Sequence, residues 1–160
     1  MDLDSASIGM LAALIILVAF SAYFSATETA FTSLNRIRLK ARADDGNLRA
    51  ARTLKLAEDY DKLLSTILLG NNVVNITATT VATVLCTRWF HQYGPTVSTV
   101  ALTVIILIFG EISPKSIAKD CAETWAMFSA PILQVLIWVF TPLNAVLDRK
   151  STRLNSSHLH

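Results

Sequence analysis

Oxygen-bearing side chains recur at helical spacing inside segments that are otherwise apolar. Within each segment the side chains share one face of a helix, because residues three and four apart lie above one another. The members are Ser21, Ser25, Glu28 and Thr32 in the first segment, and Ser65, Asn72, Asn75 and Thr79 in the second. Asn71 lies beside the second stripe and shares a face with Asn75. A polar group at membrane depth is costly and therefore points to a function, or to a hydrogen bond between helices.

A third group of oxygen atoms is expected around Gly110 and Glu111. Pro114 has no N–H group, so the carbonyl of Gly110, four residues earlier, loses its usual helical partner. Proline also disfavours helical angles at the preceding residue, Ser113. We therefore predict a break in the helix that frees the Gly110 backbone carbonyl beside the carboxylate of Glu111.

These three groups together indicate a site for a hard cation. Hydroxyl, amide, carboxylate and carbonyl oxygens favour such cations over transition metals, which prefer sulfur and imidazole ligands. A single carboxylate with neutral oxygens suits Mg²⁺, which takes about six ligands near 2.1 Å; ligand type also permits Na⁺. The alternative is that the polar stripes only hold helices together and that Glu111 simply pairs with Lys115.

The elements that carry these residues are predicted to cross a membrane. The chain has 160 residues, of which 52% are hydrophobic and 16% are charged. Each of its four long stretches without Asp, Glu, Lys or Arg exceeds the roughly 20 residues that span a bilayer as a helix. The stretches are Ser5–Thr27, Leu63–Thr87, Trp89–Gly110 and Thr124–Leu147. Such hydrophobicity excludes disorder for most of the chain, and the acidic N-terminus is not that of a signal peptide.

Positive charge gathers between the first two hydrophobic stretches. Eight of the fourteen Lys and Arg residues lie between Leu34 and Lys62, which places this segment in the cytoplasm and the N-terminus outside. Apolar residues at helical spacing, interrupted by the turn signal Asp45-Gly46-Asn47, predict two short helices there. The net charge of +2 gives no sign of nucleic-acid binding.

The fourth stretch contains Pro131 and Pro142, and a full crossing would place Arg149 and Lys150 outside. We therefore expect a bent pair of juxtamembrane helices at the cytoplasmic leaflet, with a fourth span as the alternative. The predicted fold is all-α: three transmembrane helices plus a juxtamembrane belt bent at both prolines. The expected bounds within the domain 1–150 are 6–33, 62–87 and 96–119 for the spans, 34–60 for the cytoplasmic helices and 122–148 for the belt. Residues 151–160 are expected to be a non-native tail.

Three motifs in register resemble the cyclin-M/CorC family of magnesium transporters. They are SATETAFTSLNRIRL at Ser25–Leu39, LLSTILLGNNVVN at Leu63–Asn75 and FGEISPKSIA at Phe109–Ala118. The resemblance implies a homodimer in the cell membrane, plasma or inner, with the C-terminus in the cytoplasm. It also implies Mg²⁺ efflux, with sodium coupling proposed, and Mg²⁺ ligands at Ser25, Asn75, Glu111 and the Gly110 backbone. Members normally continue into CBS domains, to which nothing here corresponds.

Two hypotheses for function follow from these observations. The first is a magnesium transporter domain that also draws on Ser21, Glu28, Asn71 and Asn72 as secondary candidates and on Pro114 as the helix break. The second is a non-transporting membrane sensor or anchor whose polar stripes are packing contacts. An enzyme is not expected, because the sequence contains no metalloprotease motif, nucleophile elbow or nucleophile–base pair.

Overall fold

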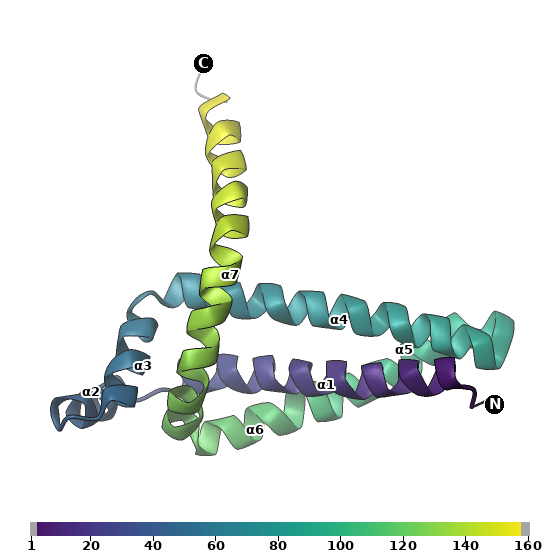
Figure 1. Ribbon diagram of the computed structural model, residues 1–160, viewed down its shortest axis with the longest axis horizontal. Coiled ribbons are helices and arrows are strands. Elements are labelled where there is room, and N and C mark those ends of the chain that lie inside the picture. Colours follow the sequence, from purple (N-terminus) through teal and green to yellow (C-terminus); the bar gives the residue numbers. More distant parts are fainter. Residues whose placement is uncertain (1–2, 158–160) are drawn as a thin grey trace.

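The computed structural model describes residues 3–157, and every regular element in that range is helical (Figure 1). The elements in chain order are α1 (Ser5–Thr32), α2 (Arg36–Asp44), α3 (Leu48–Glu58), α4 (Tyr60–Phe90), the 3₁₀ turn η1 (His91–Tyr93), α5 (Gly94–Ile105), the π-helix η2 (Ile106–Ile112), α6 (Ser113–Asp120) and α7 (Ala122–Ser157). The all-α prediction is confirmed.

Three helical legs lie side by side and form a bundle. They are α1, α4 and the continuous path α5–η2–α6, and α1 packs against both of the others (Figure 1). The chain reverses at η1, so α4 runs opposite to its two neighbours. The helices that carry the two polar stripes, α1 and α4, are therefore packed against each other.

Three segments are long and apolar enough to cross a membrane: Ser5–Thr32, Tyr60–Asp120 and Ala122–Pro142. Tyr60–Asp120 contains the reversal at η1 and therefore supplies two legs of the bundle. In contrast, α7 runs across α1 and α4 instead of beside them (Figure 1).

The belt differs from expectation in one respect. It is a single helix, α7, that passes through Pro131 and Pro142 without ending. Each proline removes one N–H donor, and the neighbouring helical bonds suffice to carry the helix past it. At the end of the bundle where α2 and α3 lie, α7 also contacts α3 (Figure 1).

Asparagine side chains cap the N-termini of the two short helices, α2 and α3. The side chain of Asn35 accepts a hydrogen bond from the Arg38 N–H, and that of Asn47 accepts from Arg49 and Ala50. Such caps satisfy N–H groups that have no partner inside the helix. The expected turn lies between α2 and α3, where Gly46 adopts a positive φ of 97° that glycine tolerates best.

Two apolar clusters hold the legs together. The larger joins α1, α4 and α7 through Phe24, Phe31, Leu63, Ile67 and Leu133. The smaller packs Ala26 and Ala30 of α1 against alanines at the α6–α7 corner. Small residues allow membrane helices to approach closely, which brings α1 near η2 and α6.

Charged and capping contacts tie the other end of the bundle. Asp4 caps α1 through the Ser7 N–H at 2.9 Å, and its second carboxylate oxygen lies 2.6 Å from Arg88 Nη2 near the end of α4. Hydrogen bonding from Ser7, followed by the charge of Arg88, lowers the pKa of the Asp4 carboxyl. The carboxylate therefore stays charged and joins the first leg to the second.

The reversal from α4 to α5 brings Gly94 against the backbone of Thr87. A Cβ atom built on Gly94 would lie 2.4 Å from Thr87 Cα and 2.5 Å from Thr87 N. Both contacts are with main-chain atoms, which cannot rotate aside as a flexible side chain can. The tight hairpin therefore requires glycine at this position.

We expect Gly94→Ala to destabilise the folded protein by about 1–3 kcal/mol, because the added methyl group overpacks the hairpin. Thermal unfolding in detergent measures the change. Gly9→Ala is the matched control, since a Cβ at Gly9 meets nothing within 4 Å. Equal melting temperatures for the two variants would contradict the close approach at Thr87.

Candidate functional site

Ser21 is the point where the polar stripes of α1 and α4 meet. Its hydroxyl is buried and lies 3.0 Å from Asn75 Oδ1 and 3.4 Å from Asn71 Oδ1. A hydroxyl carries one proton, so it donates to only one of these oxygens at a time. Three oxygen atoms are thus gathered with one hydrogen between them, an arrangement that a cation would stabilise.

The third leg reaches this oxygen cluster at Gly110. The residue is buried, and a Cβ atom placed on it would lie 3.2 Å from Ser21 Oγ. A side chain here would press on the Ser21 hydroxyl, whereas glycine lets the backbone of η2 come close. The structure therefore brings Ser21, Asn71, Asn75 and Gly110 together from three different legs.

We predict a break in the helix at Pro114, and the structure shows none. Ser113 has helical angles, φ −65° and ψ −46°, so the expected effect of proline on this residue is wrong. The backbone instead widens into the π-helix η2, in which the Ser113 N–H donates to the carbonyl of Ile108. Pro114 still cannot donate to Gly110. Single π-turns inside α-helices are frequent at functional sites.

Asn75 and Glu111 line one cavity of about 340 Å³ between α4, α5 and η2. Hydroxyl groups of α5 complete its polar side, and aliphatic side chains of α5 and η2 form the rest. The additional polar residues are Thr79 of α4 and Ser98, Thr99 and Thr103 of α5. The predicted carboxylate and the predicted amide therefore face a common space.

Ser25 lies one helical turn beyond Ser21 and has a different environment. It is 1% exposed, and its hydroxyl oxygen is buried with no hydrogen-bond partner among the described residues. Buried polar atoms are nearly always paired, so this hydroxyl can still accept a partner, as can those of Tyr23 and Ser129, which are also buried and unpaired in the described part of the chain. Ser25 is thus available to a cation near the cluster.

Glu111 forms an ion pair with Lys115. The Lys115 Nζ atom lies 3.4 Å from Glu111 Oε2, and the Glu111 side chain is 33% exposed. The pairing that we raised as an alternative to ion binding is therefore present. It leaves the carboxylate on the cavity wall with a charged partner already beside it.

Two of the secondary candidates lie away from the cluster. Asn72 is exposed on α4, and Glu28 is half-buried on α1. Glu28 is seven residues from Ser21, or about 10 Å along the helix axis. Neither residue shares the Ser21 hydrogen bonds.

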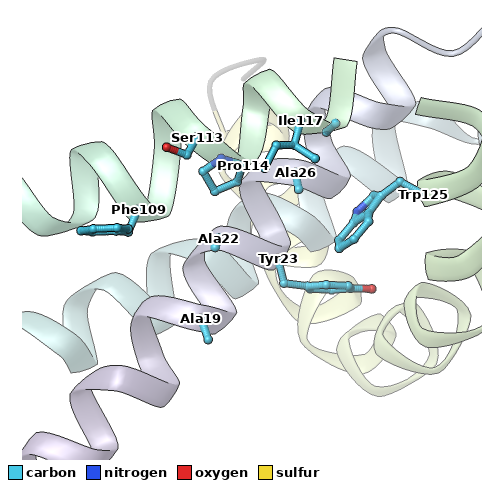
Figure 2. Close-up of a pocket in the computed structure, with 10 residues that line it drawn as sticks. Ala19, Ala22, Tyr23, Ala26, Phe109, Ser113, Pro114, Ile117 and Trp125 are labelled. Carbon is cyan, nitrogen blue, oxygen red and sulfur yellow. The ribbon is translucent and has the colours of Figure 1, made fainter. Parts of the chain in front are cut away.

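A second cavity, of about 380 Å³, lies on another side of the third leg (Figure 2). It is lined by Ala19, Ala22 and Tyr23 of α1, by Phe109, Pro114 and Ile117 of the third leg and by Trp125 of α7. Figure 2 shows the Pro114 ring between the third leg and α1. Pro114 therefore faces this apolar space, while Glu111 lines the other cavity.

The sequence did not predict that hydroxyl groups of α5 line the cavity with Asn75 and Glu111. Ser98 and Thr99 are adjacent and Thr103 follows one helical turn after Thr99, within an apolar segment. Serine and threonine in membrane helices commonly bond to their own backbone, as Thr99 does with the Pro95 carbonyl at 2.8 Å. Their spacing alone therefore carried little weight.

The ligand chemistry of the site rests on neutral oxygens. Within the described range there is no group of three or more His, Cys, Asp or Glu side chains that could hold a metal ion. The cluster around Ser21 offers hydroxyl and amide oxygens, and the carboxylate of Glu111 lines the cavity that Asn75 also lines. Oxygen ligands of these kinds favour a hard cation over a transition metal.

Comparison with known proteins identifies the family. The model of the cyclin M transmembrane N-terminal domain matches residues 12–157. A UPF0053 protein of Haemophilus influenzae is 45% identical over 130 residues, which cover 81% of this chain and 31% of that protein. The UPF0053 inner membrane protein YfjD of Escherichia coli is 38% identical over 136 residues, 81% of this chain and 32% of that protein.

A more distant relative, named polyamine export protein, also comes from Haemophilus influenzae. It is 26% identical over 144 residues, which cover 82% of this chain and 33% of that protein. The chain thus spans about a third of the length of these three relatives. The resemblance in the three sequence motifs is confirmed, and the chain belongs to the cyclin M (CNNM) family as a transmembrane N-terminal domain.

Proposed function

We propose that this domain transports Mg²⁺ across the membrane through the oxygen cluster around Ser21. The supporting observation is the convergence of Ser21, Asn71, Asn75 and Gly110, which come from three separate legs of the bundle. If these polar side chains only held two helices together, one satisfied hydrogen bond between the helices would be enough. Two amide oxygens around one hydroxyl, with the unpaired Ser25 hydroxyl a turn away, leave acceptors for a cation.

The proposed ligands are Ser21, Ser25, Asn75, Glu111 and the Gly110 carbonyl, with Asn71 in reserve. These five oxygens and Asn71 together would fill the six positions around Mg²⁺, and water can take any that a side chain leaves open. Glu111 supplies negative charge that offsets the removal of water from a divalent ion, which Mg²⁺ gives up reluctantly. We propose efflux as the direction and Na⁺ as the coupling ion, both following from the family resemblance.

The cluster lies deep enough for a membrane-embedded site. Ser21 is 16 residues from the start of α1 and 11 from its end, or about 24 Å and 16 Å along the axis. The hydrocarbon core of a bilayer is about 30 Å thick. These distances are compatible with a site inside the hydrocarbon core.

The orientation and location follow from charge and from the relatives. The basic helices α2 and α3 are proposed to face the cytoplasm. Because α7 crosses the bundle at that same end, we place it along the cytoplasmic surface and not through the bilayer (Figure 1). The membrane is proposed to be the inner or plasma membrane, since one relative is named an inner membrane protein.

A homodimer is part of the proposal. Three legs enclose a hydrated path poorly, and alternating access requires one surface to move against another. The aligned relatives extend well beyond this domain, and CBS domains are expected in that remainder. A sensor or anchor that binds Mg²⁺ without moving it is the competing outcome.

Polyamine export is a second candidate, favoured by one specific observation. The primary ammonium group of Lys115 lies on the Glu111 carboxylate, so this acid accepts an alkylammonium ion. Aliphatic and hydroxyl side chains line the adjoining cavity, as a flexible polyamine would require. The relative named polyamine export protein belongs to the same group of matches.

Flux in proteoliposomes tests the proposed function. We expect the wild-type protein to move Mg²⁺ and Glu111→Gln to abolish the movement, because the variant keeps size and hydrogen bonding but loses the charge. Spermidine flux under the same conditions distinguishes polyamine export. Wild-type vesicles that bind Mg²⁺ without moving it would favour the sensor and contradict transport.

Asn75→Ala should weaken Mg²⁺ binding at least tenfold, about 1.4 kcal/mol, by removing a ligand oxygen. Calorimetry on the purified protein measures the affinity. Asn72→Ala is the matched control: it removes the same group from an exposed position on the same helix and should leave the affinity unchanged. If both variants bind alike while folded, Asn75 is not a ligand.

Single cysteines test the orientation in a background without Cys86 and Cys121. Lys40→Cys in α2 and Gln92→Cys in η1 are exposed and lie at opposite ends of the bundle. We expect a membrane-impermeant thiol reagent to label position 40 from the cytoplasm and position 92 from outside. The reverse pattern would contradict the placement of the basic helices.

A further inference from the structure

The contact between Lys115 and Glu111 places a positive charge from the chain itself at the only carboxylate of the proposed site. The Lys115 ammonium is 3.4 Å from Glu111 Oε2, and 42% of the lysine side chain is exposed. The two residues are four apart, with Pro114 between them, at the junction of η2 and α6. The ion pair therefore sits where the backbone changes from π to α geometry.

A carboxylate at membrane depth needs a positive partner or a water-filled cavity, and Glu111 has both a base and a cavity beside it. An isolated charge there is expensive, so intramembrane acids pair with a base or face a water-filled cavity. Without cargo, Lys115 meets this need by neutralising Glu111 from within the chain. When a cation binds Glu111, two positive charges would compete for one carboxylate.

We infer that Lys115 is a built-in competitor, which occupies Glu111 while the site is empty and is displaced by the transported cation. The inference rests on the proposed function, because it requires Glu111 to bind cargo. The displaced ammonium remains tethered nearby and repels the bound ion. It thereby lowers the affinity of the site and speeds release, as conduction requires of any binding site on a transport path.

The position of Lys115 allows such a movement. Its four-carbon stem is flexible and its charge is compact, so the ammonium can leave without disturbing the helix. Lys115 is five residues from the end of α6 at Asp120, about 7.5 Å along the axis. A lysine at this distance can extend its charge towards the polar interface.

The first test compares Mg²⁺ affinity and maximal flux among charge variants of the purified chain. Lys115→Met keeps the length of the side chain and removes its charge. We expect about tenfold tighter Mg²⁺ binding, within the usual range of coupling between two sites, together with a lower maximal flux. Lys115→Arg restores the charge and should return both values most of the way to wild type.

Lys119→Met is the matched control. It removes the same charge one helical turn later, from a residue that lines a separate polar pocket beside α2 and α7. A general change in surface charge would alter both variants equally. A competitor role alters only the variant at position 115, and it separates affinity from maximal flux.

A second measurement needs no substitution and so does not depend on how a variant folds. A membrane-soluble carbodiimide activates the Glu111 carboxyl, and the Lys115 amine then attacks it to form an amide while the urea leaves. We expect mass spectrometry to find this cross-link in the Mg²⁺-free protein. Saturating Mg²⁺ should suppress it, because the ion holds the carboxylate and the lysine has moved away.

The outcomes separate the two proposals. Tighter binding by Lys115→Met and Mg²⁺-sensitive cross-linking support the competitor role. Wild-type Mg²⁺ binding with unchanged or weaker affinity in Lys115→Met, or cross-linking that is insensitive to Mg²⁺, overturns this inference alone. Failure of the wild-type protein to bind Mg²⁺ overturns the proposed function, and the inference with it.

Discussion

The structure depends on one constraint: oxygen atoms placed at membrane depth must find partners inside the protein. Lipid offers no hydrogen bonds, so the polar stripes of α1 and α4 turn towards each other and meet at Ser21. Small residues on α1 then let the third leg approach. In this account the arrangement that satisfies the polar groups in the resting state also assembles the ligands for a cation.

The π-helix η2 adapts the third leg to that arrangement. A regular α-helix ending in Pro114 would leave the Gly110 carbonyl without its donor. The wider turn shifts hydrogen bonding by one residue, as the Ser113–Ile108 bond shows, and presents Gly110 to Ser21 while Glu111 lines the cavity beside Asn75. In the proposed mechanism, the π-helical backbone adds the Gly110 carbonyl to the oxygen ligands that the side chains provide.

Hydrophobicity and charge were enough to predict the helical legs and the two short helices of the basic connection. The juxtamembrane position of the last helix stays a prediction. Helical spacing placed Ser21 on the face of α1 that meets Asn71 and Asn75 of α4, whereas Asn72, also predicted for this stripe, is exposed. Spacing does not say which turn of one helix meets which turn of another, because that depends on the axial offset between them. Ser21, a secondary candidate after Ser25, is therefore the residue whose hydroxyl lies against Asn71 and Asn75 of α4. The π-turn was also out of reach, since it arises from tertiary packing at Gly110 combined with the missing N–H of Pro114.

The most direct measurement is a structure determined with Mg²⁺ bound, with Mn²⁺ as an anomalous marker in a parallel sample. The account predicts one peak between α1, α4 and η2, about 2.1 Å from oxygens of Ser21, Asn75 and Glu111. The Ser21–Asn75 hydrogen bond should be lost in that state. A peak elsewhere, or a Ser21–Asn75 bond that persists at saturating Mg²⁺ with no ion beside it, would contradict the central claim.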